Sequence, residues 1–412
     1  MDLDALRGAI KSGAAAFRIV TELQPAGGDG DKVFPPTYEG STYAEETRII
    51  AGEPVRCVLL DSVQSQANRL ESALLEGHRA GDLRFPLVEV DFAGTDAAEV
   101  GKVSALEAPH RVFDGLFLAC SYNNQPFRRR KAKQAASDEG KRLETATPAN
   151  ATPLFEICPT ALVFGVWDSH GANGGLGEKF QRALVSEVIG IGVEKGVRPS
   201  SRIDPVVRTT KDLPVVRRED GSWAEAPEGA SGSLKLSEVG LGNVTPSLVD
   251  KNKKPNHGGV TIRAARQITV ISLPALRRLR FPLPADRLPA EEAKADPKGR
   301  RTAELERDLA AQAVLCAVAL VAVAHQWRVG FSYRSRCDLA PMTPMPVVEQ
   351  VGGVAAGRFS LTPQDATALL DSAVAQAVKL GLRWEAEPIT LRPTPDLVSI
   401  VRRSRDLAAE GS

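Results

Sequence analysis

The sequence of 412 residues is poor in cysteine, and the cysteines it has are far apart. They are Cys57, Cys120, Cys158, Cys316 and Cys337. The odd number and the lack of any C-x-x-C pair exclude a zinc-ribbon spacing and argue against a disulfide framework. We therefore expect free, buried thiols in a reducing compartment.

Long hydrophobic runs are also missing. The longest apolar stretch covers residues 313–324 and is too short to span a bilayer. The first ten residues contain two aspartates and no apolar run, unlike a signal peptide. These features predict a cytoplasmic protein with no membrane partner. A composition of 43% hydrophobic and 25% charged residues predicts a folded chain rather than a disordered one.

Neither sign of charge dominates, because the formal net charge is only +1. The total hides a separation: residues 1–119 contain 11 Lys+Arg and 19 Asp+Glu, and the remaining residues contain 41 and 32. Residues 251–280 carry basic residues and no acid, and basic residues also concentrate in 127–133 and 195–218. Blocks of like charge repel unless an anion lies between them, and a phosphate backbone is the usual anion.

Hydrophobic patterning predicts a mixed α+β fold whose sheet is assembled from distant segments. The expected strands cover 16–23, 55–60, 87–92, 161–167, 260–273 and 382–391, and the expected helices cover 62–76, 178–189, 302–326 and 362–380. In the first helix, Asp61 is the expected N-cap, Gln64 completes a capping box, and Gly77 suits the position after the last turn.

The elements predict one core over residues 5–392 with two insertions. A basic, polar insertion covers 120–152, and an irregular insertion rich in Pro, Gly and Ser covers 199–256. Residues 300–380 should be mainly helical, and residues 402–412 should form a flexible tail.

A candidate anion site is the glycine loop Gly171–Gly177, because backbone amides of such a loop can hold a phosphate. The helix expected after it would present Lys179 and Arg182 to the same phosphate. A tight turn without a ligand is the alternative. A nucleotide-binding regulator is a further alternative, although the loop lacks the G-K-[ST] ending of a P-loop.

Asp168 and His170 offer another alternative, a metal-dependent nuclease or other hydrolase. Neighbouring residues rarely form a catalytic triad, and no histidine pair has metal-ligand spacing. We therefore predict no catalytic residue, no metal site and no cofactor. Residues 330–336, G-F-S-Y-R-S-R, interleave aromatic residues with arginines, a pattern that suits stacked bases beside phosphates. Aromatic residues make up only 5% of the chain, so stacking cannot dominate binding.

Five stretches carry a resemblance to a known family: T-R-I-I at 47–50, C-V-L-L-D-S-V-Q-S-Q-A-N-R-L-E at 57–71, P-H-R-V-F-D-G at 109–115, W-D-S-H-G at 167–171 and G-G-V-T-I-R at 258–263. Together with the chain around them, over roughly residues 5–390, they resemble CRISPR-associated backbone proteins of the RAMP superfamily, the Cas-seven group. The version in type I-U (also called I-G) systems is the most similar.

The resemblance implies a modified ferredoxin-like palm, as in RNA-recognition motifs, with an inserted thumb and helical elements. It implies a non-catalytic subunit that binds CRISPR guide RNA (crRNA) in a Cascade-like effector complex for antiviral defence. Several copies would assemble head to tail along one guide, beside other subunits of the complex, and would leave the bases free to pair with target DNA. A recruited helicase-nuclease would cut that DNA.

In such families the helix after an early strand faces the guide backbone, which here is the helix of residues 62–76. The residues we expect to contact RNA are Arg48, Gln64, Ser65, Asn68, Arg69, His170, Lys179, Arg182, Arg263 and Arg266. A metal-dependent nuclease of the same superfamily stays open as an alternative. Capping of the helix is the competing role for Gln64.

Overall fold

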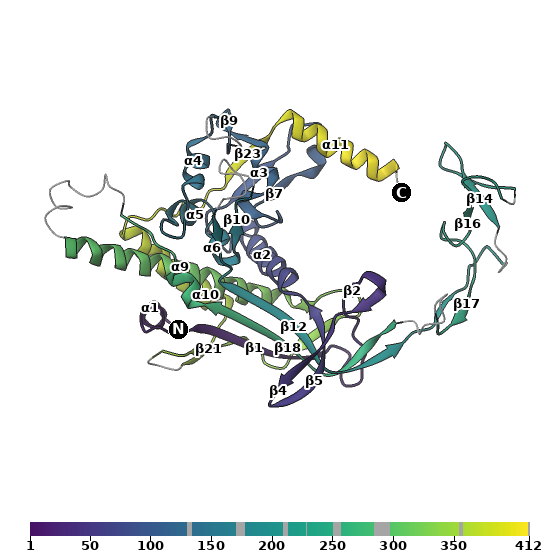
Figure 1. The fold of residues 1–412 in the computed structure, drawn as a ribbon, viewed down its shortest axis with the longest axis horizontal. Helices are drawn as coiled ribbons and strands as arrows, with labels where there is room; N and C mark the ends of the chain where they lie inside the picture. The colour runs from purple at the N-terminus through teal and green to yellow at the C-terminus, as the bar shows by residue number, and fades with distance from the viewer. Residues whose placement is uncertain are drawn as a thin grey trace.

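The computed structural model describes residues 1–129, 134–169, 178–208, 213–227, 229–249, 257–283, 297–353 and 357–410. The chain forms the α+β fold that the sequence predicts (Figure 1). All five cysteines are buried and free, as expected. The ferredoxin-like arrangement of the palm stays a prediction.

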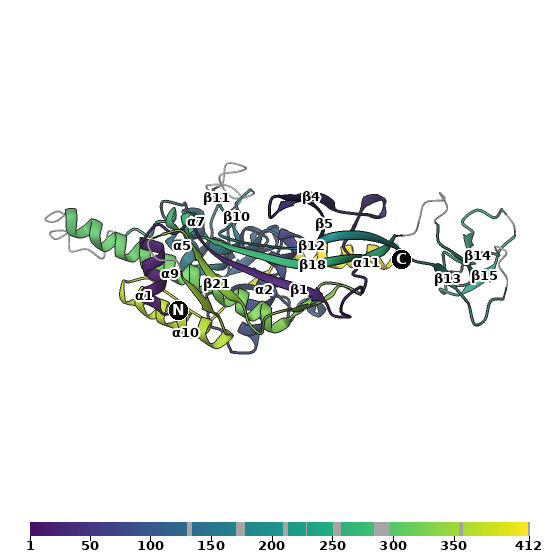
Figure 2. The ribbon, with the colours of Figure 1, turned by 90° about the horizontal axis from the view of Figure 1, so that it is seen from below.

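One large sheet organises the molecule. Its strands are β1 (Ala16–Pro25), β4 (Glu45–Ile50), β5 (Glu53–Asp61), β12 (Leu184–Val197), β18 (His257–Ser272), β19 (Phe331–Ser332), β20 (Asp338–Pro341), β21 (Val347–Val351) and β22 (Arg358–Ser360). The spatial order is β19-β20-β1-β18-β12-β5-β4, with β21 paired to β1 and β22 paired to β21. Seen nearly edge-on in Figure 2, the sheet has α1 (Leu3–Lys11), α9 (Pro297–Val329) and α10 (Pro363–Lys379) along one side.

Strand β12 corrects the helix predicted over 178–189. Its sequence L-V-S-E-V-I-G-I-G-V is rich in β-branched residues, which fit a pleated surface better than a helix. It lies between β18 and β5 and pairs with both, so that both of its edges are hydrogen-bonded. Strand pairing with these distant segments decides the structure of residues 184–189, and no local sequence pattern shows such pairing.

Residues 161–167 are likewise not the buried strand that their apolar run predicts. They form most of α6 (Thr160–Phe164), a short helix that packs against α9, followed by β10 (Val166–Trp167). A continuous apolar run of this length fits a buried helix as well as a buried strand. Gly165 separates the two elements with a φ of 80°, a left-handed conformation that favours glycine.

The other long helices agree with the sequence. Helix α2 (Val63–Arg79) packs on β12 and on α9, and α10 begins with Thr362 as its N-cap. Helix α2 starts one residue later than expected, because Ser62 and not Asp61 is the N-cap. Gly77 lies inside this helix rather than after it, where a Cβ atom would come within 2.7 Å of a methyl group of Leu83.

Helix α9 is the core of the helical layer. Residues 298–329 are long enough and apolar enough to cross a membrane, but their apolar window is completely buried by the rest of the protein. A core helix passes the same test of length and composition. Packing against α1, α2, α6, α7 (Leu273–Arg277) and α10 therefore accounts for the apolar sequence.

A second, smaller sheet lies beside the helices, with the order β7-β6-β23-β8-β9. Its strands are β6 (Val88–Asp91), β7 (Lys102–Ser104), β8 (Cys120–Tyr122), β9 (Gln125–Pro126) and β23 (Ile389–Pro393). Short helices around it are α3 (Gly115–Leu118), α4 (Asp138–Glu144) and α5 (Thr152–Ile157). The remaining hairpins are β2 (Thr37–Tyr38) with β3 (Thr42–Tyr43) and β10 with β11 (Lys179–Phe180).

The insertion expected at 199–256 contains short strands, and Figure 1 shows it extended away from the main sheet. They are β13 (Ser200–Arg202), β14 (Pro214–Arg217), β15 (Trp223–Glu225), β16 (Leu234–Lys235) and β17 (Val244–Ser247). The tail predicted at 402–412 is instead helical as far as Glu410, in α11 (Pro395–Glu410). Ion pairs from Arg402 to Asp96 and from Arg405 to Glu99 hold this helix, and sequence patterns do not reveal such distant partners.

Candidate nucleic-acid interface

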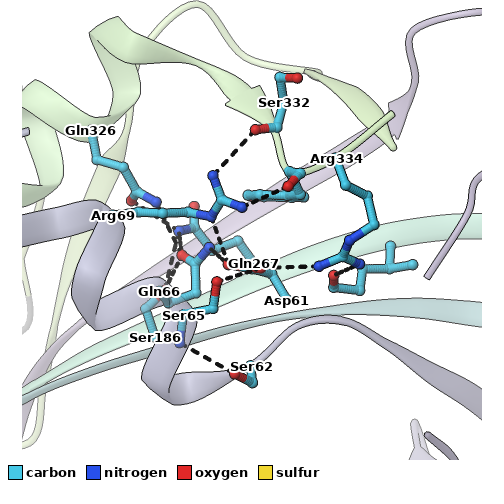
Figure 3. A network of polar contacts seen from close by, with 12 residues as sticks. Asp61, Ser62, Ser65, Gln66, Arg69, Ser186, Gln267, Gln326, Ser332 and Arg334 are labelled. Atoms are coloured by element: carbon cyan, nitrogen blue, oxygen red, sulfur yellow. Dashed lines mark hydrogen bonds and ion pairs between the residues drawn. The ribbon is translucent and has the colours of Figure 1, made fainter. Parts of the chain in front are cut away.

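Asp61 ends β5 directly before α2, and its side chain is fully buried. Its carboxylate accepts hydrogen bonds from three side chains of the helix, Ser65 Oγ at 2.8 Å, Gln66 Nε2 at 2.6 Å and Arg69 Nε at 3.0 Å (Figure 3). Ser62 Oγ caps the helix by accepting from the Ser65 amide. Asp61 therefore fixes the start of the helix to the end of the strand.

Gln66 extends this network to the centre of the molecule. Its side-chain oxygen accepts from Ser186 Oγ on β12 at 3.1 Å, Gln267 Nε2 on β18 at 2.7 Å and Gln326 Nε2 on α9 at 3.1 Å (Figure 3). Sequence reasoning missed Gln66. The available signal was an amide side chain beside Ala67 on the apolar face of the helix, where a buried polar group needs a partner.

Two arginines connect the same network to the segment after α9. Arg69 donates to the backbone oxygens of Ser332 at 3.3 Å and Tyr333 at 2.8 Å, and its guanidinium lies 4.8 Å from the centre of the Tyr333 ring. Arg334 lies on the other side, 3.8 Å from a carboxylate oxygen of Asp61. Arg69, an expected RNA ligand, thus has a structural role in the free protein.

The aromatic pattern at 330–336 does not form a stacking surface. Phe331 and Tyr333 are buried in a core between the sheet and the end of α9. Burial, with the charge of Asp61 nearby, raises the pKa of the Tyr333 hydroxyl well above its usual range. Arg336 lies over the ring of Phe34, with its guanidinium carbon 4.8 Å from the centre. The prediction that bases stack on these rings is wrong, because protein atoms already cover them.

Helix α2 presents two other expected ligands to solvent. Gln64 and Asn68 are exposed and lie four residues apart, so they share one face of the helix. Gln64 does not complete a capping box, since the box would require the residue three after Ser62, which is Ser65. Ser65 uses its hydroxyl on Asp61. The amides of Gln64 and Asn68 are therefore open to a ligand on this face of the helix.

Two of the expected cations of the large sheet are held by carboxylates. Arg48 on β4 donates to Glu187 on β12 at 2.6 Å and to Glu46 at 2.5 Å. The hydrogen bond to Glu187, more than any other contact, raises the pKa of the Arg48 guanidinium above its usual value. Arg266 on β18 donates to Glu22 at 2.7 Å, directly across from it on β1. Both charges are neutralised within the protein.

Arg263 differs from these two. It is exposed on β18, and its side chain lies over Gly192 of β12, where a Cβ atom would come within 2.9 Å of the Arg263 Cβ. Gly192 has a φ of 69°, so the local backbone also favours glycine. The glycine therefore leaves the space in which this arginine crosses the strand and reaches solvent.

Lys179 and Arg182 do not share a helix, because Lys179 lies on β11 and Arg182 lies in the short segment between β11 and β12. The Lys179 ammonium is exposed and sits 4.3 Å from the centre of the Trp167 ring. Arg182 donates to the backbone oxygen of Phe164 at 3.0 Å. Burial and the charge of Arg111 lower its pKa. Lys179 is thus accessible, and Arg182 supports the end of α6.

Asp168 is engaged by an arginine. Arg128 donates to it at 2.5 Å, and the guanidinium carbon of Arg128 lies 4.5 Å from the centre of the Phe113 ring. His170 and the loop Gly171–Gly177 lie outside the described residues. Within the described part of the chain, no group of three or more His, Cys, Asp or Glu side chains could hold a metal ion.

Part of the chain is similar to a known family. Residues 17–195, less than half of the chain, match the family model described as CRISPR-associated protein GSU0053. No curated protein matches. Among solved structures, the crystal structure of Csc2 from Thermofilum pendens aligns at 12% sequence identity and a TM-score of 0.24, covering 92% of this chain and 80% of that chain.

Proposed function

From the similarity of residues 17–195 to CRISPR-associated proteins, we propose that this protein is a non-catalytic backbone subunit of a type I CRISPR effector complex that binds guide RNA. The family match is the observation that carries the proposal. The arrangement of polar groups adds a physical argument, because the amides of Gln64 and Asn68 and the cations of Lys179 and Arg263 are exposed, whereas Arg48 and Arg266 are paired with carboxylates.

We use exposure to divide the proposed residues into direct ligands and supporting residues. We assign contact with the RNA backbone to Gln64, Asn68, Lys179 and Arg263, which are exposed. Amide groups hydrogen-bond phosphate oxygens and ribose hydroxyls without reading the base, and cations neutralise phosphates. An RNA held by its backbone in this way keeps its bases free to pair with target DNA. The sequence of the target would then be read by base pairing alone.

The supporting residues hold the elements that carry the four direct ligands. Ser65 and Arg69 hold α2 to β5 and to residues 332–333. Arg48 and Arg266 would have to leave their carboxylates to reach a phosphate, which costs the energy of an existing ion pair. We therefore assign them to the rigidity of the sheet beneath the RNA.

A backbone role requires copies that repeat along one RNA. The separation of charge, with acids concentrated in residues 1–119, suits contact between the acidic surface of one copy and the basic surface of the next. Head-to-tail contacts of this kind build open helical assemblies. Other subunits of the complex and a recruited helicase-nuclease, which would cut the target DNA, complete the proposed system.

Co-purification from cells that express a CRISPR array tests the proposal. We expect the protein to carry RNA of uniform length, and RNA binding should weaken steeply as salt rises. The proposal is contradicted if the protein carries no RNA under these conditions and then shows no salt-sensitive RNA binding.

The non-catalytic part has its own test, incubation of labelled RNA with the purified protein and Mg²⁺. We expect intact RNA with the wild type, since Arg128 holds the carboxylate of Asp168. Cleavage by the wild type that disappears in Asp168→Ala, while circular dichroism shows the variant still folded, would establish the nuclease alternative instead.

A further inference from the structure

A cavity of about 490 Å³ lies on the helical side of the molecule, between α4, α5, α9 and the residues that follow α10. Its volume falls in the range of small-molecule sites, about 300–1,000 Å³. Three arginines line it, Arg142 of α4, Arg307 of α9 and Arg383 after α10. Glu156 of α5 is the acidic residue in the described lining. The cavity is therefore positively charged at neutral pH.

The arginines come from three separate segments and differ in how they are held. Arg307 is almost fully buried and donates to the backbone oxygens of Phe281 at 3.0 Å and Leu380 at 2.7 Å. These contacts fix the plane of its guanidinium at the wall of the cavity. A guanidinium in low dielectric attracts an anion more strongly than one in water.

Glu156 offsets one of the three positive charges, because its carboxylate is paired with Arg142. One of its oxygens accepts from Arg142, and the other accepts from the backbone amide of Arg383 at 3.1 Å. The Arg383 side chain itself is exposed at the cavity. Among the described residues, the buried hydroxyl of Thr152 has no hydrogen-bond partner, and it lines the same cavity.

We propose that this cavity binds a phosphate group, carried either by a small phosphorylated molecule or by the phosphorylated end of an RNA. Guanidinium groups match the oxygens of phosphate in pairs, and phosphate carries the negative charge that the lining lacks. The Thr152 hydroxyl supplies a neutral donor to a further oxygen. This site lies apart from α2 and from the interface proposed above.

Titration calorimetry of the full chain with inorganic phosphate tests the site. We expect saturable binding that weakens about tenfold in Arg383→Ala, the loss of one charge-assisted hydrogen bond, and less in Thr152→Val. Arg383 is exposed, so its removal should leave the fold intact. Arg358→Ala removes another exposed arginine, on β22 and outside the cavity lining, and should bind phosphate like the wild type.

A second arm compares RNA with a 5′-phosphate against the same RNA with a 5′-hydroxyl. Tighter binding of the phosphorylated RNA that Arg383→Ala abolishes identifies the RNA end as the ligand. Equal binding of the two RNAs, with phosphate still bound, identifies a small phosphorylated molecule.

The proposal is overturned if phosphate shows no saturable binding, if Arg383→Ala binds it as the wild type does, or if acetate binds equally well. Retention of guide RNA by Arg383→Ala in the co-purification above keeps this result separate from the proposed function.

Discussion

The network around Gln66 and the ion pair between Arg128 and Asp168 are both buried polar contacts, yet they distribute hydrogen bonds differently. At Gln66, one side chain contacts β12, β18, α9 and the end of β5. None of the buried side-chain atoms of Asp61, Gln66 or Gln267 lacks a partner within the described residues. At Arg128, two guanidinium nitrogens and one oxygen of Asp168 have no partner in the same described part.

The difference teaches how each region responds to change. A network with several partners per group loses a fraction of its hydrogen bonds when one member is removed. Where a single ion pair compensates a buried charge, removing one partner removes all of that compensation. The first arrangement defines the junction of sheet and helices, and the second makes β10 and its surroundings depend on a single residue.

The largest expected effect comes from breaking the ion pair. Asp168→Ala leaves the Arg128 guanidinium buried without its carboxylate and should lower the free energy of unfolding by about 4 kcal/mol. Urea unfolding followed by circular dichroism measures the change.

The double variant Arg128→Met with Asp168→Ala should recover most of that loss, because an apolar side chain of similar length needs no anion. A double variant as unstable as the single one would mean that the ion pair is not the source of the loss. Asp168 would then stabilise the region by another route.

The next effect tests the network at its centre. Gln66→Leu leaves the donors of Ser186, Gln267 and Gln326 without their shared acceptor, and we expect a loss of roughly 3 kcal/mol in the same unfolding assay. Gln64→Leu, two residues earlier on the exposed face, is the matched control and should change stability by less than about 0.5 kcal/mol. Similar losses in both variants would show that helix propensity, and not the network, sets the result.

Much of this fold follows from local patterns. The strands at 16–23, 87–92 and 260–273 and the helix at 302–326 are long or strongly patterned, and the structure has all of them. Two assignments of helix or strand are wrong, at 161–167 and 178–189, and the first falls on a short apolar run that fits either class. Pairing with β18 and β5 decides the second, and packing against α9 decides the first.

The candidate site was less predictable, because sequence shows which residues are cations but not which are already paired. Arg48 meets Glu187 across 139 positions of chain, and Arg266 meets Glu22 across 244. The spacing of residues in the sequence does not reveal partners this far apart. Exposure of Gln64 and Asn68 was predictable from helical periodicity, since the apolar residues of α2 occupy the opposite face.

A third buried polar region, the histidines of α2 and α9, sharpens the comparison through pH. His325 is buried, and neither ring nitrogen has a partner within the described residues. Burial, followed by the charge of Arg328, lowers its pKa below 6.5, and Asp82 opposes the shift. The folded protein therefore binds a proton less readily than the unfolded chain, so stability is retained above about pH 6.5 and falls as pH decreases below it.

Unfolding midpoints at pH 7.5 and 5.5 measure this effect. His325→Leu should reduce the difference between the two midpoints, because it removes one group that must stay neutral when folded. His110→Leu changes an exposed histidine and should leave the difference as it is. An unchanged difference in His325→Leu would place the pH sensitivity elsewhere, for which His78, whose pKa is also lowered by burial, is the next group to replace.

The smallest expected effect separates a free cation from a paired one on the same strand. Arg263→Ala removes an exposed charge and should reduce the slope of log affinity against log salt by about 0.7, the value for one phosphate of a single strand. Arg266→Ala removes a charge that Glu22 already neutralises, so the slope should stay unchanged. Fluorescence anisotropy with labelled guide RNA across a salt series measures both. An equal reduction of the slope in both variants would mean that RNA displaces Glu22 from Arg266. The paired arginines would then belong to the interface. A lower slope in Arg263→Ala alone would show that pairing within the protein, rather than the number of cations, decides which residues hold the RNA.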